Sequence, residues 1–216
     1  MKKKVLVVGT FRSGTNLAAH MLNEYYHSDA VFSEWFWKHG VPPTQIKCPL
    51  PKQVHILVLS KDPLKLNASL YRFWLEKRPE LDAGDNISEF IRRRFIVYDN
   101  TGGNVRPRYY YSSPTEYWNQ FYYSWLNWPE VQGRVHFLRL SDMLVDPGQH
   151  LGKFAQAAGL KQVDPGTVML PTRPIGPTPE ANKRDECFNL KPGDTEWITQ
   201  HTDSEIAKAL GYDLSV

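Results

Sequence analysis

Residues 9–16 form a short segment whose residue types and spacing suit the binding of an anion. Its two glycines, Gly9 and Gly14, have the spacing of a Walker A phosphate loop. An apolar run precedes the segment and an amphipathic run follows it, so the expected order is strand, loop, helix. Such a loop directs backbone N–H groups and a helix N-terminus at a phosphate. We therefore predict an anion-binding loop here, in preference to a plain tight turn.

The differences from a Walker A loop narrow the choice of ligand. A nucleotide triphosphatase needs Lys after the second glycine, and then Ser or Thr to hold magnesium. Those positions are Thr15 and Asn16, and the cationic side chain has moved to Arg12, inside the loop. Because this loop lacks the usual Lys and magnesium ligand for a γ-phosphate, it favours a phosphosulfate donor, and no metal is expected.

The elements that must position this loop alternate along the chain. Apolar runs predict strands at 5–8, 30–32, 54–59 and 135–140. Helices are expected after the loop and at 63–77, 87–95, 115–127, 147–158 and 203–210, whereas 98–114 and the Pro-rich 164–192 are expected to be irregular. This order predicts an α/β protein with three layers, α/β/α, around a central parallel sheet. We expect a single domain, 1–216, with an acceptor-binding or lid insertion around 78–128.

The loop resembles that of the sulfotransferases that use 3'-phosphoadenosine-5'-phosphosulfate (PAPS). That family carries Lys or Arg, then Ser-Gly-Thr, then Thr or Asn, directly after its first strand. In this chain the matching residues are Arg12, Ser13, Gly14, Thr15 and Asn16. The resemblance implies the P-loop nucleotide-hydrolase-like fold of the sulfotransferases, and contacts from these residues to the 5'-phosphosulfate of PAPS.

A second resemblance concerns the 3'-phosphate of the nucleotide. The family has Arg, any residue and Pro after a later core strand, with Ser eight positions after the Arg. This chain has Lys61, Asp62 and Pro63, followed by Ser69. Lys can hold a phosphate as a point charge but lacks the two-pronged geometry of Arg. Lys61 also follows a predicted parallel strand, at the end where α/β sheets bind ligands.

Two weaker matches complete the implied nucleotide site. Residues 47–51 are similar to a family segment, Lys-Thr-His-Leu-Pro, and imply that Lys47 stabilises the leaving group. Pro49 stands where that segment has its catalytic His, so the base must come from elsewhere. Lys183 and Arg184 are the best match to the family's late nucleotide-binding loop.

The acceptor must lose a proton as it attacks sulfur, so a base within hydrogen-bond reach is expected. Glu34 is the first candidate, because it follows the predicted second strand and some sulfotransferases use a Glu there. His39, from the same stretch, is the next candidate. The expected reaction is a one-step in-line displacement in which 3',5'-ADP leaves, while backbone amides, Arg12 and Lys47 hold the developing charge.

The acceptor is expected to be a hydroxyl or amine of a small molecule or carbohydrate. Aromatic residues are dense between residues 109 and 125. Part of this set has helical spacing and belongs to the core, and the rest would suit a sugar, a phenol or a hydrophobic alcohol. The run Arg92-Arg93-Arg94 would attract an acidic acceptor, although a solvated charged face explains it better.

The composition of the chain argues against several other functions and settings. The net charge of +3 is too small to indicate nucleic-acid binding. The apolar run at 5–8 is too short for a signal peptide, and no other run is long enough to cross a membrane. Cys48 and Cys187 form neither a disulfide framework nor a metal-ligand pattern, so a reducing, cytoplasmic setting is expected. The sequence leaves the oligomeric state open.

Two rival interpretations remain. A P-loop kinase of a small metabolite or nucleotide fits the glycine spacing and the fold class, although Thr15 and Asn16 count against it. A non-catalytic relative that binds a nucleotide or a partner is the other, because the catalytic His is missing and Lys61 replaces Arg.

Overall fold

The computed structural model describes residues 2–31, 34–35, 37–40, 50–78, 80–99, 106–175 and 189–214. The chain divides into two compact units. The first comprises Met1–Lys61 and Ser124–Pro177, and the second comprises Asp62–Tyr123 and Thr178–Val216. The predicted insertion at 78–128 falls mostly in the second unit, which also takes in the preceding helix and the C-terminal segment.

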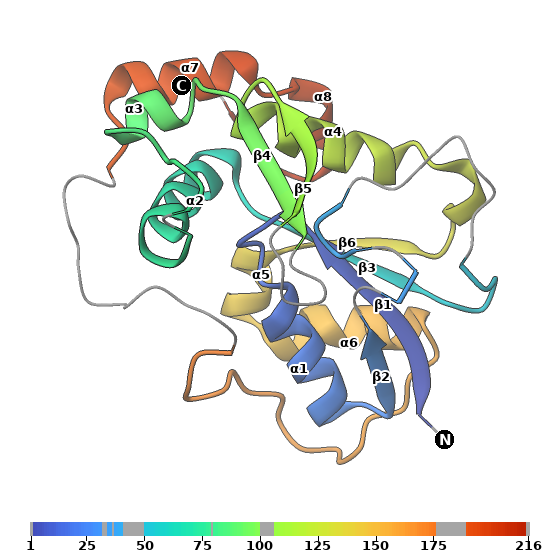
Figure 1. The fold of residues 1–216 in the computed structure, drawn as a ribbon. Coiled ribbons are helices and arrows are strands. Elements are labelled where there is room, and N and C mark those ends of the chain that lie inside the picture. Colours follow the sequence, from blue (N-terminus) through green and yellow to red (C-terminus); the bar gives the residue numbers. More distant parts are fainter. Residues whose placement is uncertain are drawn as a thin grey trace. The chain divides into compact units, whose positions relative to one another are not determined.

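A four-stranded parallel sheet forms the centre of the first unit, in the order β2-β1-β3-β6 (Figure 1). Its strands are β1 (Lys3–Gly9), β2 (Ser28–Val31), β3 (Ile56–Ser60) and β6 (Val135–Arg139). Leu6 pairs with Val31 on one side and with Ile56 on the other. The apolar residues of β1 and β3 are almost wholly buried, as expected for strands covered on both faces. The predicted α/β class with a central parallel sheet is confirmed.

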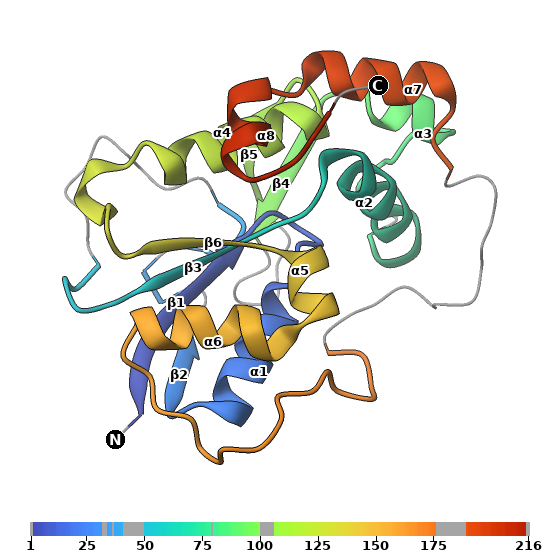
Figure 2. The ribbon, with the colours of Figure 1, turned by 180° about the vertical axis from the view of Figure 1, so that it is seen from behind.

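Helices α1 (Thr15–Tyr25), α5 (Leu140–Val145) and α6 (Pro147–Ala157) lie on one side of this sheet (Figure 2). Side chains alternate along a strand, so Val5 and Val7 face these helices. Met21 and Leu22 of α1 and Phe154 of α6 belong to the same buried cluster. Each fully buried aliphatic side chain contributes about 1.5–3 kcal/mol to stability, and together they fix α1 against the end of β1.

Local signals set several helix boundaries where the sequence predicted them. In the second unit, α2 (Pro63–Lys77) begins at Asp62, whose Oδ1 accepts from the Lys65 N–H at 2.9 Å. In the first unit, Asp146 caps α6 in the same way. Each carboxylate satisfies an otherwise unpaired N–H of the first turn, and a proline follows each cap at the first helical position.

The second unit is built around aromatic side chains. Its elements are α2, α3 (Ile87–Phe90), β4 (Phe95–Asp99), β5 (Arg106–Tyr111), most of α4 (Pro114–Leu126), α7 (Pro192–His201) and α8 (Ser204–Ala209). The centre of the Phe95 ring lies 5.1 Å from the centre of the Trp74 ring and 5.4 Å from the centre of the Tyr117 ring. Three tyrosines of the aromatic stretch stay exposed: Tyr109, Tyr110 and Tyr123. Much of this stretch is therefore core, and an acceptor pocket built from the rest stays a prediction.

The sequence interpretation of residues 87–114 was wrong in two places. The helix that begins at Ile87 ends at Phe90, and 95–99 forms a strand instead. Part of the expected irregular segment, Arg106–Tyr111, is the strand that pairs antiparallel with it, with Phe95 opposite Tyr111. Both runs are rich in aromatic and β-branched residues, which favour a pleated strand. Gly102, Gly103, Pro107 and Pro114 in the same stretch led the sequence interpretation to predict an irregular segment instead.

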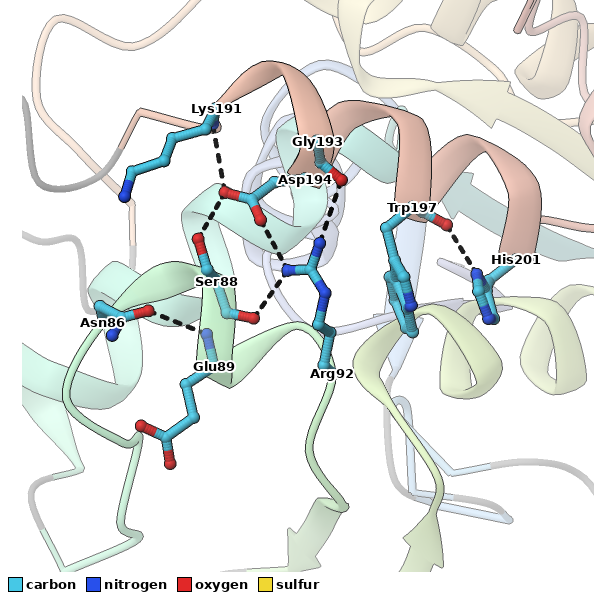
Figure 3. Close-up of polar contacts among 9 residues, drawn as sticks. All are labelled: Asn86, Ser88, Glu89, Arg92, Lys191, Gly193, Asp194, Trp197 and His201. Atoms are coloured by element: carbon cyan, nitrogen blue, oxygen red, sulfur yellow. Dashed lines mark hydrogen bonds and ion pairs between the residues drawn. The ribbon is translucent and has the colours of Figure 1, made fainter.

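Helix α7 was not predicted, and a long-range ion pair holds it (Figure 3). Nη1 of Arg92 donates to Oδ1 of Asp194 at 2.6 Å and to the carbonyl oxygen of Ser88 at 2.8 Å. Nη2 donates to the carbonyl oxygen of Gly193 at 3.0 Å. The guanidinium lies 5.4 Å from the centre of the Trp197 ring. Arg92 therefore joins α3 to α7.

The carboxylate of Asp194 is charged although its side chain is only 3% exposed. Burial raises its pKa, but hydrogen bonds from Arg92 and Ser88 outweigh that effect and hold the pKa below its ordinary value. The Ser88 hydroxyl donates to Oδ2 at 2.7 Å, and the Lys191 N–H donates to the same oxygen at 3.2 Å. Removing one partner of such a buried charge is destabilising, because it leaves the remaining polar groups without their hydrogen bonds.

Replacing Asp194 with Ala should destabilise the second unit by about 1–3 kcal/mol, because Arg92 and Ser88 lose their acceptor. The lowered pKa gives a second expectation. The contribution of Asp194 is present above its unfolded pKa of about 3.9 and is lost as the pH falls through the lower folded value. Thermal unfolding at neutral and acidic pH measures both effects. Glu196→Ala, an exposed change on the same helix, is the control, and equal unfolding temperatures for the two variants would contradict this account.

Candidate anion-binding site

The loop between β1 and α1 has two residues in the left-handed region. Arg12 has φ of 64° and Gly14 has φ of 88°. Between them Ser13 is wholly buried, with its hydroxyl donating to the carbonyl oxygen of Thr10 at 2.7 Å. A left-handed conformation costs a residue with a side chain about 1–2 kcal/mol. Such strain at Arg12 points to a functional constraint on this loop.

Close packing requires glycine at position 9, whereas the positive φ of 88° favours glycine at position 14. A Cβ atom on Gly9 would lie 2.3 Å from the Ser13 hydroxyl oxygen and 2.7 Å from the carbonyl oxygen of Leu59 on β3. A Cβ atom on Gly14 would lie 2.6 Å from a methyl carbon of Leu140. The loop therefore lies directly against the neighbouring strand and against α5.

Helix α1 begins at this loop with its N-terminus directed at it. The residue before the helix, Gly14, has no side chain with which to cap the first turn. The first helical hydrogen bond runs from the N–H of Ala18 to the carbonyl oxygen of Gly14 at 3.0 Å. The N–H groups of Thr15 and Asn16 precede this bond, at the positive end of the helix dipole. This arrangement suits a bound phosphate.

A second segment, which we call the 37–40 turn, holds the start of the loop. The N–H of Gly40 donates to the carbonyl oxygen of Trp37 at 2.9 Å and closes the turn. The N–H of Gly9 donates to the carbonyl oxygen of Lys38 at 2.9 Å. Nδ1 of His39 donates to the carbonyl oxygen of Gly9 at 2.7 Å. Both backbone polar groups of Gly9 are thus bonded to this turn.

Three rings fill the space between the loop and the 37–40 turn. Phe11 stacks on His39 with ring centres 4.4 Å apart. Trp37 packs edge-on against each of them, with ring centres 5.4 Å apart in both cases. Phe11 is 6% exposed and His39 is 9% exposed, so the contact is largely closed to water. The loop and the turn therefore form one packed structure.

The side chains beside the loop make the site electropositive. Nζ of Lys38 donates to Oδ1 of Asn16 on the first turn of α1. Burial lowers the pKa of Lys38 to about 8. Burial also lowers the pKa of His39 to about 3, helped by the charges of Lys38 and Arg12 and opposed by the hydrogen bond to Gly9. His39 is therefore neutral at pH 7, with its proton on Nδ1.

The structure pairs Glu34 with Lys4 of β1. Its two carboxylate oxygens lie 2.9 and 3.0 Å from Nζ of Lys4, and the pair is partly exposed. Lys4 lies near the start of β1, about 16 Å along the strand from Gly9 at the usual rise per residue. The candidate base that the structure brings to the loop is His39, the second choice from the sequence.

Lys61 follows β3 at the same edge of the sheet as the loop, because Leu59 of β3 pairs with Gly9. Ser69 is partly buried on α2. The two residues belong to different units, so their joint 3'-phosphate pocket stays a prediction. Lys47, Lys183 and Arg184 lie outside the described residues.

Comparisons with known proteins do not assign the chain to a family. A scan against protein-family models finds no match, and a search of curated proteins finds none either. In the part of the chain that the structure describes, no three His, Cys, Asp or Glu residues come together as they would around a metal ion. No helix among the described residues has the length and apolar character needed to cross a bilayer.

The sequence interpretation missed Lys38 as a residue of this site. Lys38 lies in no motif, and its contacts with Gly9 and Asn16 are long-range ones that periodicity does not predict. The sequence did contain one indication. Lys38 and His39 follow the aromatic Trp37 a few residues after the predicted strand at 30–32, and the carboxyl ends of parallel strands are where α/β sheets bind ligands.

The neutral, buried His39 should make the protein sensitive to mild acid. Its pKa is about 3 in the folded state and about 6.5 when unfolded. The unfolded state binds more protons between these values, so the stabilisation is complete above about pH 6.5 and falls as the pH drops toward the folded pKa. We expect His39→Asn, whose amide can replace Nδ1 as donor, to lose less stability than the wild type between neutral and acidic pH.

Urea unfolding at several pH values measures this difference. The lowered pKa values of His55 and His136 affect both proteins equally. His201→Asn, a change at an exposed histidine, is the control and should follow the wild type. Parallel pH profiles for the wild type and His39→Asn would show that His39 is not held neutral.

Proposed function

We propose that this protein is a sulfotransferase that moves a sulfuryl group from PAPS to a hydroxyl or amine of a small-molecule or carbohydrate acceptor. The observation that carries the proposal is the loop between β1 and α1, with Arg12 in a strained conformation at a helix N-terminus. Thr15 and Asn16 follow, where a nucleotide triphosphatase has Lys and a magnesium ligand. The three-layer, P-loop-like sulfotransferase fold and a cytoplasmic setting belong to the same proposal.

In this proposal the loop holds the 5'-phosphosulfate end of PAPS. The N–H groups of the first turn of α1 and the guanidinium of Arg12 would bind the phosphate oxygens. The hydroxyl of Thr15 would add a donor. Lys61 and Ser69, with Lys183 and Arg184, would hold the 3'-phosphate. Two anchored phosphates would fix the sulfur atom for attack from one direction.

The transfer would be a single in-line displacement. The acceptor oxygen or nitrogen forms a bond to sulfur while the bond from sulfur to the bridging oxygen breaks, and 3',5'-ADP leaves. The negative charge that grows on the leaving phosphate would be held by the loop N–H groups, by Arg12 and by Lys47. The chain would act mainly by positioning and electrostatics.

The proton from the acceptor needs a base, and two residues compete for this role. Glu34 is bonded to Lys4, which weakens its candidacy. The position of His39 beside Gly9 supports it instead, because the tautomer that donates from Nδ1 carries its lone pair on Nε2. A bound dianion would raise the low pKa of His39, because it offsets the charges of Lys38 and Arg12.

A binding protein without catalytic activity is the second candidate. Two observations favour it: the ion pair that occupies Glu34, and the low pKa of His39, which makes it a weak base in the free protein. A small-molecule kinase is the remaining alternative.

Ligand-induced thermal shifts separate these possibilities. We expect 3',5'-ADP to stabilise the protein without magnesium, by about 2.7 kcal/mol when its concentration is a hundred times the Kd. Arg12→Gln should reduce the shift, whereas Arg173→Gln, at an exposed site outside the loop, should not. Stabilisation by Mg-ATP alone would support the kinase and reject the sulfotransferase. Binding of PAPS without release of 3',5'-ADP across a panel of acceptors would favour the binding protein.

A further inference from the structure

Lys38 touches both ends of the loop. Its carbonyl oxygen accepts from the N–H of Gly9, the last residue of β1. Its ammonium group donates to the side chain of Asn16, in the first turn of α1. The side chain therefore runs alongside the loop and ends at the helix N-terminus, where an anion bound by the first-turn N–H groups would lie.

The arrangement supplies a charge that the loop sequence lacks. In a Walker A loop the lysine comes directly after the second glycine and reaches the phosphates from within the loop. Here that position is Thr15. The ammonium of Lys38 comes instead from a separate segment, which the contacts of Gly9 and the ring packing of Trp37 and His39 hold in place.

We infer that Lys38 is a second cationic ligand of the anion held by this loop, and that Asn16 is the residue that positions it. The inference deepens the proposed function and rests on it, because it requires that the loop bind an anion. The class of ligand is a phosphate or phosphosulfate group carrying at least two negative charges, shared between Arg12 and Lys38.

The energetics agree with this role. Burial that lowers the pKa of Lys38 to about 8 shows that the charged form is poorly solvated in the free protein. A dianion beside it would restore favourable interactions for the ammonium. Of the neighbouring titratable groups, Arg12 stays protonated and His39, with a pKa of about 3, stays neutral between about pH 7 and pH 9. Of the three described residues Arg12, Lys38 and His39, Lys38 is thus the one expected to change charge in that range.

The test is the affinity for 3',5'-ADP, measured by calorimetry from about pH 7 to pH 9, where the phosphates keep their charge because their second pKa is about 6. The wild-type affinity should be constant up to about pH 8 and then fall by up to about tenfold per pH unit, since binding requires the protonated amine. Lys38→Arg should bind without this decline. A wild-type affinity that does not change over the range would overturn the inference, and this arm needs no variant.

Variants provide the second arm. Lys38→Met should weaken binding about 10- to 100-fold at neutral pH, through loss of one charge-assisted hydrogen bond. Asn16→Ala should weaken it less, because Lys38 keeps its charge but loses its positioning partner. Lys153→Met removes an exposed lysine on α6 and should bind as the wild type does. Thermal unfolding checks that each variant is folded.

Inorganic pyrophosphate, used as a second probe at neutral pH, separates the failure of this inference from that of the proposed function. If the wild type binds 3',5'-ADP and Lys38→Met binds it equally well, the inference is wrong and the proposed function stands. If pyrophosphate binds in a Lys38-dependent way and 3',5'-ADP does not bind, the inference stands and the sulfotransferase is rejected. If the wild type binds neither anion, both are rejected.

Discussion

Gly9 is the point on which the candidate site depends. Its N–H is hydrogen-bonded to Lys38 and its carbonyl oxygen to His39, which lies 30 positions away in the chain. Its missing side chain lets β1 approach the carbonyl oxygen of Leu59 closely. Because Gly9 is fixed to the sheet and to the 37–40 turn at once, the loop that follows has little freedom. Such rigidity is what a preorganised anion site requires.

Several features of this site are energetically unfavourable in the protein without a ligand. Arg12 adopts a left-handed conformation, Lys38 is partly buried with a lowered pKa, and His39 stays neutral mainly because it is buried, with the charges of Lys38 and Arg12 adding to that effect. A bound anion would stabilise the charged form of Lys38 and would pair with the guanidinium of Arg12. Core packing alone gives no reason to place two cations and the positive end of a helix dipole together. The interpretation as an anion site explains this combination with a single ligand.

Local signals in the sequence predicted the part of the structure that local interactions determine. The apolar runs of β1 and β3, the glycines of the loop and the caps at Asp62 and Asp146 act within a few residues of their own position. The parallel sheet followed from their order. Residues Arg12 to Asn16 could be identified as a loop followed by a helix start for the same reason, since the two glycines and the helix follow one another directly in the sequence.

Long-range contacts determine the rest, and the sequence did not predict them. Helix α7 contains a glycine and a threonine near its start, which weaken the helical signal, and it depends on the bond between Arg92 and Asp194, two residues that are 102 positions apart. The partner of Glu34 is Lys4, on a different element, so its position beside the predicted second strand did not reveal where its carboxylate lies.

The most direct measurement is a crystal structure of the protein with 3',5'-ADP bound. The account predicts the 5'-phosphate within hydrogen-bond distance of the N–H groups of Thr15 and Asn16, of the Arg12 guanidinium and of the Lys38 ammonium. A nucleotide bound elsewhere, with Phe11 of the loop still packed against the 37–40 turn, would contradict it.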